Sequence, residues 1–192
     1  MAVLYFHILR VDPADPNWEE RDRFILSKGH AAPALYSVLA RAGFFPLSDL
    51  AGFRTMDSPL HGHPKQNPAI GVEVTSGSLG QGLSFGLGCV LASRLASREG
   101  RVYVLTGDGE CDEGQVWEAA MAAAHFRADR LTAIVDYNKY QQTGPIEREM
   151  ALEPFAEKWR AFGWQVLEAD GHDIAALARA LAEAASVSGR PQ

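Results

Sequence analysis

The chain has 192 residues, of which 47% are hydrophobic and 22% charged, a composition typical of one folded globular domain. Its formal net charge of −6, without any cluster of Lys and Arg, argues against a nucleic-acid-binding surface. Two cysteines are too few for a disulfide framework, which favours a reducing, cytoplasmic compartment. No apolar run reaches about 18 residues, so no membrane-spanning helix is predicted.

The first part of the chain predicts short elements joined by irregular segments. In chain order these are a helix over 1–10, a loop over 11–23, a strand over 24–27, a helix over 31–42, a loop over 44–70 and a strand over 72–75. The apolar start lacks the cationic region and cleavage site of a signal peptide, so it is predicted to be a core helix. The loop over 44–70 contains four prolines, and such long loops usually have a function.

The rest of the chain alternates helices with strands. The predicted elements are a helix over about 79–98, a strand over 101–106, a helix over 113–126, a strand over 131–138, a helix over 152–162, a strand over 164–169 and a helix over 173–185. This alternation predicts a single α/β domain over 1–192, with an open parallel sheet and helices on both faces. The chain starts without an N-cap and stops where a strand is expected, so we expect a domain trimmed at both ends or a short natural subunit.

Polar side chains follow two of the predicted strands. Asp108 stands between two glycines directly after the strand over 101–106, and Asn138 closes the strand over 131–138. The carboxyl ends of parallel strands face a common ligand crevice, so the two side chains are expected to converge. Their oxygens suit Mg²⁺ holding a diphosphate, and the flanking glycines allow backbone N–H groups to approach phosphate. The alternative is a tight Gly-Asp-Gly turn and an unrelated polar strand end.

A glycine-rich stretch over 77–88 follows the strand predicted over 72–75 and opens a helix. The dinucleotide-binding pattern G-x-G-x-x-G fails here, because Phe85 or Leu91 stands where the third glycine is required. Two roles remain open. Gly77 and Gly80 would let the backbone approach a bound ring, or the glycines would only allow close packing of the helix.

Two of the six histidines are candidates for binding a ligand. His30 begins a helix after an extended segment, where it can donate an N–H to an anion, although a plain polar helix start is equally consistent. His61 and His63 have metal-pair spacing, but no further ligand is near in sequence, so zinc is disfavoured. A contact with substrate or cofactor is the preferred prediction for His63.

Two acids lie in the helix that follows Asp108. Glu113 and Glu118 are five residues apart, so they do not share one helix face cleanly. They either form a favourable acidic first turn and a solvated face, or act in catalysis. A catalytic role would require their burial at a subunit contact.

Taken together, these residues resemble the N-terminal, diphosphate-binding half of transketolase. The resemblance covers essentially the whole chain, and it is specific because several motifs occur in one order. The segments that carry it are 22–31, 62–64, 71–82, 107–118, 136–138 and 159–164.

The resemblance implies thiamine diphosphate and a divalent cation, Mg²⁺ or Ca²⁺, as cofactors. It implies that Asp108 and Asn138 bind the metal through side-chain oxygens, and that Tyr140 binds it through its backbone carbonyl. Gly109 and His30 would contact the diphosphate.

The resemblance also assigns roles around the rings of the cofactor. Glu110 belongs to the cofactor-binding set, and the rings would be bordered by Gly77, Ser78 and Leu79. His63 would lie near the thiazolium and the hydroxyls of the substrate. Glu113 and Glu118 would share protons between paired active sites at the dimer contact.

The implied activity is transfer of a two-carbon ketol unit from a ketose, or its phosphate, to an aldose. The family's Ser-x-His-x-Gly motif, a later diphosphate-binding His and the whole pyrimidine-binding half are absent from the sequence. In some bacteria the two halves are separate subunits, so a pyrimidine-binding partner is expected, in a dimer or heterotetramer. Alternatives are a 2-oxo-acid dehydrogenase component, a deoxyxylulose-phosphate synthase, or an inactive truncated chain.

Overall fold

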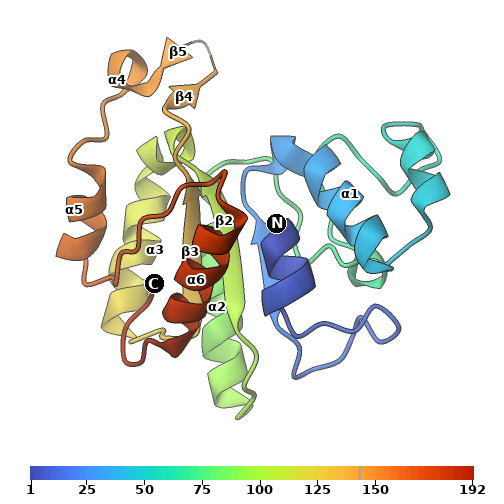
Figure 1. Cartoon of the computed structure of the whole chain (residues 1–192), viewed down its shortest axis with the longest axis horizontal. Coiled ribbons are helices and arrows are strands. Elements are labelled where there is room, and N and C mark those ends of the chain that lie inside the picture. Colours follow the sequence, from blue (N-terminus) through green and yellow to red (C-terminus); the bar gives the residue numbers. More distant parts are fainter. Residues whose placement is uncertain (143) are drawn as a thin grey trace.

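A three-stranded parallel sheet, in the order β1-β2-β3, forms the centre of the molecule (Figure 1). The structure is a computed structural model that describes residues 1–142 and 144–192. The strands are β1 Arg23–Leu26, β2 Val102–Gly107 and β3 Leu131–Asp136. Val102 pairs with Arg23 on one side and Leu131 on the other, and Gly107 pairs with Asp136. The carboxyl ends of the strands therefore share one edge of the sheet.

Helices surround this sheet and account for most of the regular structure. The α-helices are α1 Ala32–Ala42, α2 Gly82–Leu95, α3 Gly114–His125, α4 Ile146–Glu149, α5 Phe155–Ala161 and α6 Ile174–Ser186. Shorter pieces are the π-helical η1 Leu4–Ile8 and the 3₁₀ helices η2 Gly29–Ala31, η3 Leu47–Gly52, η4 Pro68–Ile70 and η5 Gly109–Asp112. A small antiparallel hairpin joins β4 Tyr140–Gln141 to β5 Gly144–Pro145.

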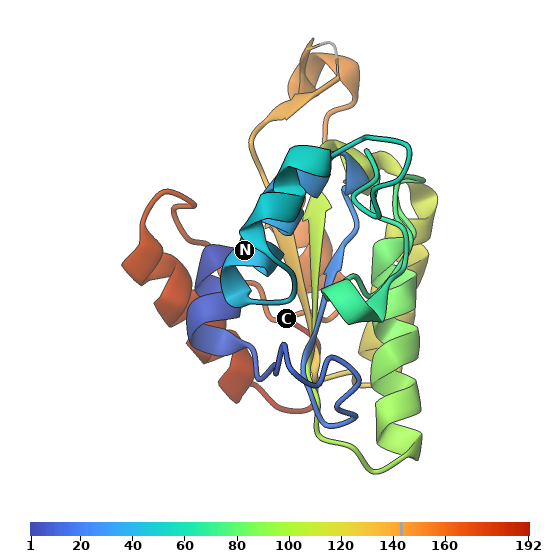
Figure 2. The same cartoon turned by 90° about the vertical axis from the view of Figure 1, so that its right-hand side faces the viewer.

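The side chains of β2 alternate between two cores, as expected for a strand with both faces covered. Val102 and Val104 belong to the core formed with α2, α3 and α5. Tyr103 belongs to the core formed with η1 and α1, on which Leu181 of α6 also packs. Figure 2 shows α2 on one side of the sheet, with η1 and α6 on the other. The predicted α/β class with helices on both faces is confirmed.

Helix α2 lies close to the sheet because small residues face it. A Cβ on Gly86 would lie 2.5 Å from the Cγ2 of Val104 and 3.1 Å from the Cδ1 of Leu131. Gly88, on the same helix, would meet nothing within 4 Å. Close packing is therefore the role of Gly86, while Gly88 leaves the outer surface of the helix open.

The strand predicted over 72–75 is wrong. Val72 makes only an isolated bridge, to Asn67, and the segment does not join the sheet. It is fixed instead by an ion pair, in which the Arg21 Nη1 lies 2.7 Å from the Glu73 Oε1. Burial raises the pKa of Glu73, and Arg21 opposes this effect. In this loop Val72 packs in the core that contains α1, whereas Val74 packs against the core formed with α2 and α3.

The strand predicted over 164–169 is also wrong, although the helices on either side of it are present. The place beside β3 is taken by Gln192, whose N–H donates to the Leu131 carbonyl (3.1 Å). The Gln192 carbonyl in turn accepts from the Ala133 N–H (2.6 Å). Gln165 pairs outside this segment, donating its N–H to the Pro191 carbonyl (2.9 Å). The segment 164–169 is therefore separated from β3 by Gln192 and does not pair with the sheet itself.

Helix α5 is held against α3 by aromatic rings. The ring of Trp117 lies 5.2 Å from Trp159 and stacks on Phe162 at 5.5 Å, and Trp159 lies 5.0 Å from Trp164. Such ring pairs add to the stabilisation that burial provides. Within the described residues, no helix is long and apolar enough to cross a bilayer.

Candidate cofactor site at the carboxyl edge of the sheet

Asp108 lies at the end of β2 and is 2% exposed. Its Oδ1 accepts the Gly109 N–H (2.8 Å), and its Oδ2 accepts the Lys139 N–H (2.6 Å). The second bond ties Asp108 to the turn that carries Asn138, so the two predicted metal ligands are brought to adjoining turns. Each carboxylate oxygen has two lone pairs, so these bonds leave acceptor capacity for a cation.

The turn after β3 is shaped by its own backbone bonds. The Asn138 Oδ1 accepts the Tyr140 N–H (2.8 Å), and Lys139 has a positive φ of 65°. Both Asn138 and Tyr140 are exposed. In the described part of the chain, no group of three His, Cys, Asp or Glu side chains is arranged to hold a metal. A cation here would thus depend on amide and carbonyl oxygens as well as on Asp108.

At this edge of the sheet, His63 and the turn that carries His30 lie beside the glycine loop, Gly77 to Gly80. A Cβ on Gly77 would lie 3.2 Å from the His63 imidazole, and one on Gly29 would lie 2.9 Å from the Gly77 N. The turn of His30 and the loop of His63 therefore both touch the segment predicted to border the cofactor rings. Partial burial, followed by the charge of Lys28, lowers the pKa of His30. At pH 7 it is consequently a neutral imidazole with one N–H donor.

Lys28 was not singled out from the sequence. Its ammonium lies 2.8 Å from the Asp136 Oδ2, joining the ends of β1 and β3 across Gly107 of β2. The lysine is 8% exposed, and its Nζ lies 3.8 Å from where a Cβ of Gly107 would be. A buried cation in a crevice that also holds His30 favours an anionic ligand. The signal available in the sequence was its position, two residues after β1 and two before His30.

Gln141 was also missed. A Cβ on Gly109 would lie 2.5 Å from the Gln141 Cβ, so this side chain covers the glycine predicted to contact diphosphate. The Gln141 amide donates to the Asp112 Oδ2 (3.0 Å). Sequence spacing gave no indication of this contact, because it depends on how the β4–β5 hairpin folds back.

The predicted residues Glu110, Glu113 and Glu118 are in different surroundings. Glu110 is 3% exposed, and protein donors occupy both of its carboxylate oxygens. Glu113 and Glu118 are exposed, although the Glu113 Cβ lies 2.8 Å from where a Cβ of Gly80 would be. Ser78 is also exposed and Leu79 is partly buried. The roles predicted for these residues stay predictions.

The residues at this edge fit a metal-bound diphosphate. An all-oxygen corner suits a hard divalent cation, while Lys28 and His30 provide donors for an anion. A Cβ on Gly29 or Gly109 would collide with a neighbouring residue, and Gly77 is in tight contact with His63, so glycine is required for the close packing of these turns.

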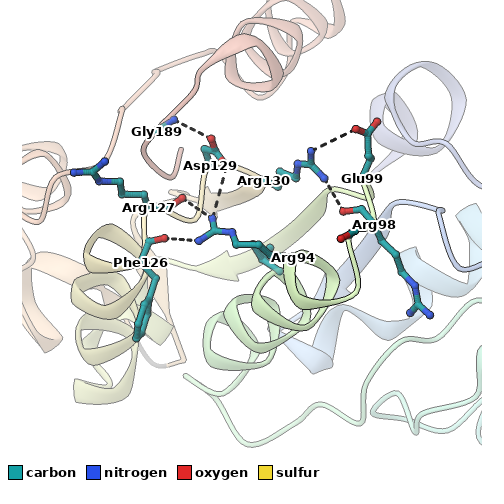
Figure 3. A pocket seen from close by; sticks show the side chains of 10 residues that line it. Arg94, Arg98, Glu99, Phe126, Arg127, Asp129, Arg130 and Gly189 are labelled. Atoms are coloured by element: carbon teal, nitrogen blue, oxygen red, sulfur yellow. Dashed lines mark hydrogen bonds and ion pairs between the residues drawn. The ribbon is translucent and has the colours of Figure 1, made fainter.

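A hollow of about 520 Å³ lies at the opposite edge of the sheet (Figure 3). Arg94 at the end of α2 donates to the carbonyls of Phe126 (2.7 Å) and Arg127 (2.8 Å) at the end of α3. Arg130 donates to the Arg98 carbonyl (2.7 Å), after α2. These arginines neutralise the carboxyl ends of two helices, which accounts for their presence without a ligand.

Comparisons with known proteins were made for the whole chain. Residues 1–192 match the family described as "Transketolase, thiamine diphosphate binding domain". The chain belongs to this family. This transketolase-type domain is 44% identical over 191 residues to 6-deoxy-6-sulfo-D-fructose transketolase subunit SqwG from Clostridium sp., covering 100% of the chain and 70% of that protein. It is 42% identical over 185 residues to human transketolase, covering 96% of the chain and 30% of that protein.

The fold of this transketolase-type domain is shared with solved transketolases. The structure of transketolase from Leishmania mexicana superposes with a TM-score of 0.92 and 34% identity, covering 98% of this chain and 30% of that one. The domain therefore spans less than a third of the full-length transketolases and about two thirds of the subunit relative. Its assignment as a thiamine diphosphate-binding domain follows from the family match.

Proposed function

We propose that this chain is the diphosphate-binding half of a transketolase, which transfers a two-carbon ketol unit from a ketose or ketose phosphate to an aldose. The proposal is carried by one observation: Asp108 and the turn of Asn138 meet at the same edge of the sheet as His30, His63 and Gly77. Thiamine diphosphate, when bound, supplies an electron sink for the two-carbon unit.

In this proposal, the residues of the chain bind the metal ion and the cofactor and orient them. Asp108, Asn138 and the carbonyl of Tyr140 hold Mg²⁺ or Ca²⁺ through oxygen atoms. His30 donates an N–H to the diphosphate, and the Gly109 backbone lies beside it. The segment formed by Gly77, Ser78 and Leu79 borders the rings.

In this proposal His63, Glu113 and Glu118 handle the substrate and protons. His63 packs on Gly77, which supports a contact between its imidazole and the hydroxyls of a sugar bound over the rings. Glu113 and Glu118 are exposed at the start of α3, and we propose that a partner covers them and couples them to a second active site. Both cysteines are free, which supports a cytoplasmic location.

A pyrimidine-binding subunit is the proposed partner. A hollow of about 550 Å³ lies over α2, beside α3, and is lined by Gln81, Ser84, Phe85, Gly88, Cys89, Ala92 and Gln115. Phe85 lines this hollow and is 50% exposed in the chain alone, so its apolar surface is available to a partner. This face continues to Glu113 through Gln115, so one subunit can cover the apolar hollow and the acids together.

The test is an assay of ketol transfer by the chain alone and by the chain mixed with a candidate pyrimidine-binding subunit. Activity is expected only in the mixture, and only with thiamine diphosphate and Mg²⁺ present. Turnover by the lone chain would contradict the divided active site. Decarboxylation of pyruvate by the mixture, without use of ketoses, would instead indicate another thiamine diphosphate enzyme.

A further inference from the structure

Glu110 is a buried carboxylate whose bonding partners come from three separate segments. Its Oε1 accepts the Gly80 N–H (2.9 Å) and a short hydrogen bond from the Ser27 hydroxyl. Its Oε2 accepts the Gly107 N–H (3.0 Å). Lys28 follows Ser27 directly, but its ammonium pairs with Asp136 rather than with Glu110. The charge of Glu110 is therefore stabilised by N–H and O–H donors whose positions must be maintained.

Ser27 extends this set of contacts to helix α2. Its hydroxyl oxygen accepts the Gly82 N–H (3.0 Å), and Ser27 itself is 1% exposed. A Cβ on Gly82 would lie 2.3 Å from that oxygen, so only glycine allows the contact. Ser27 thus accepts from the first residue of α2 while it donates to Glu110.

These bonds join the ends of β1 and β2 to the segment before α2. Gly80 ends the glycine loop with a φ of 80°, a left-handed conformation that leaves its N–H directed at Glu110. Asp108, two residues before Glu110, is the predicted metal ligand. The position of the glycine loop relative to the metal corner is consequently set through Glu110.

We infer that Glu110 and Ser27 are positioning residues. They hold the segment Gly77–Gly80 in a fixed position relative to the metal corner, which is formed by Asp108 and the turn of Asn138. The inference rests on the proposed function and refines it, because Glu110 acts through the glycine loop instead of contacting the cofactor. It predicts that loss of Glu110 affects binding of the cofactor rings more than binding of the diphosphate.

The variant Glu110→Gln tests this separation. The amide keeps the shape of the side chain but replaces one acceptor oxygen with a donor, so at least one of the three donors loses its partner. Dissociation constants are measured for thiamine diphosphate and for inorganic pyrophosphate, each with Mg²⁺, on the chain and on its complex with a pyrimidine-binding subunit. We expect binding of thiamine diphosphate to weaken on the order of tenfold, and binding of pyrophosphate by less than about threefold.

Asp22→Asn is the matched control. Asp22 is 2% exposed and also accepts backbone N–H groups, from Arg10 (2.9 Å) and Arg101 (2.8 Å), at the opposite edge of the sheet. This change removes a similar buried carboxylate, so it lowers stability without touching the glycine loop. It is expected to leave the ratio of the two dissociation constants unchanged.

Amide hydrogen exchange gives a second readout that does not need a ligand. In Glu110→Gln, the Gly80, Gly82 and Gly107 amides should exchange faster, while those of β3 keep the protection of the parent chain. Equal weakening of both ligands, or unchanged exchange at these glycines, would overturn the inference. If the parent binds neither ligand in either form, the proposed function fails, and the exchange data still decide whether Glu110 fixes the loop.

Discussion

Asp108 shows how one residue links backbone structure to a possible metal site. It is the N-cap of η5, where its Oδ1 bonds the Gly109 N–H, and its Oδ2 fixes the turn after β3. The Gly-Asp-Gly sequence predicted the turn and its place after a strand. It did not predict Lys139 as the second donor, because that contact depends on the pairing of β2 with β3.

Asp108→Asn should weaken Mg²⁺-dependent binding of thiamine diphosphate about tenfold or more, since a carboxylate is a stronger ligand for Mg²⁺ than an amide. One acceptor oxygen remains, so the fold should be kept. Calorimetric titration with increasing Mg²⁺ measures the loss, and circular dichroism checks the fold. A variant that binds the cofactor like the parent would show that the metal assignment is wrong.

Cys111 should be unreactive in the folded chain. Burial raises the pKa of its thiol from the ordinary value of 9.0 to about 12. Between these values the unfolded thiol has lost a proton that the folded thiol keeps, so the free energy of unfolding falls as pH rises through this range. With Cys89→Ser removing the other thiol, a thiol reagent at pH 8 should label the chain only in denaturant. Rapid labelling of the folded variant would contradict this.

Among the elements, two segments were predicted to be strands from their composition. Both predictions were wrong, because neither segment has a place in the sheet. The β-branched segment at 72–75 is held by Arg21 and Asn67, and the segment at 164–169 is separated from β3 by Gln192. The three central strands and the helices α1, α2, α3, α5 and α6 were predicted at nearly their observed bounds. The periodic spacing of apolar residues over long segments predicted these elements. No such pattern indicated the β4–β5 hairpin or α4.

Two glycines of α2 give a paired test of helix packing. Gly86→Ala should destabilise the chain by about 1–3 kcal/mol, because its Cβ would collide with Val104 on β2. Gly88→Ala should stabilise it by about 0.5–1 kcal/mol, because the same change has open space and improves helix propensity. Urea unfolding of the two variants measures the difference. Equal effects would mean that α2 does not approach the sheet as closely as the structure has it.

At the scale of the whole molecule, large apolar side chains are exposed at several places on the chain. Phe85 is half exposed over the hollow on α2, and Gln115 of α3, two residues after the exposed Glu113, lines the same hollow. The sequence predicted a partner from resemblance, but it could not predict which surface would meet it. The surface proposed for this contact is formed by α2 and α3, which come side by side only in the folded chain.

Phe85→Gln should therefore weaken association with a pyrimidine-binding subunit while leaving the unfolding temperature of the isolated chain nearly unchanged. Met56→Gln is the control, because Met56 is 98% exposed and lies outside the hollow. Analytical ultracentrifugation of each variant with the partner measures both. If both variants weakened association equally, or if neither weakened it, the contact with the partner would lie elsewhere on the chain.

Three of the four tryptophans gather between α3 and α5, and Trp117 also donates its indole N–H to the Cys111 carbonyl (2.8 Å) in η5. The metal corner begins three residues before that carbonyl. Ultraviolet excitation of the native protein should thus yield emission that senses ordering of this turn, with no attached dye. Titration with magnesium and cofactor could then be followed by the fluorescence of tryptophans that do not contact the ligands.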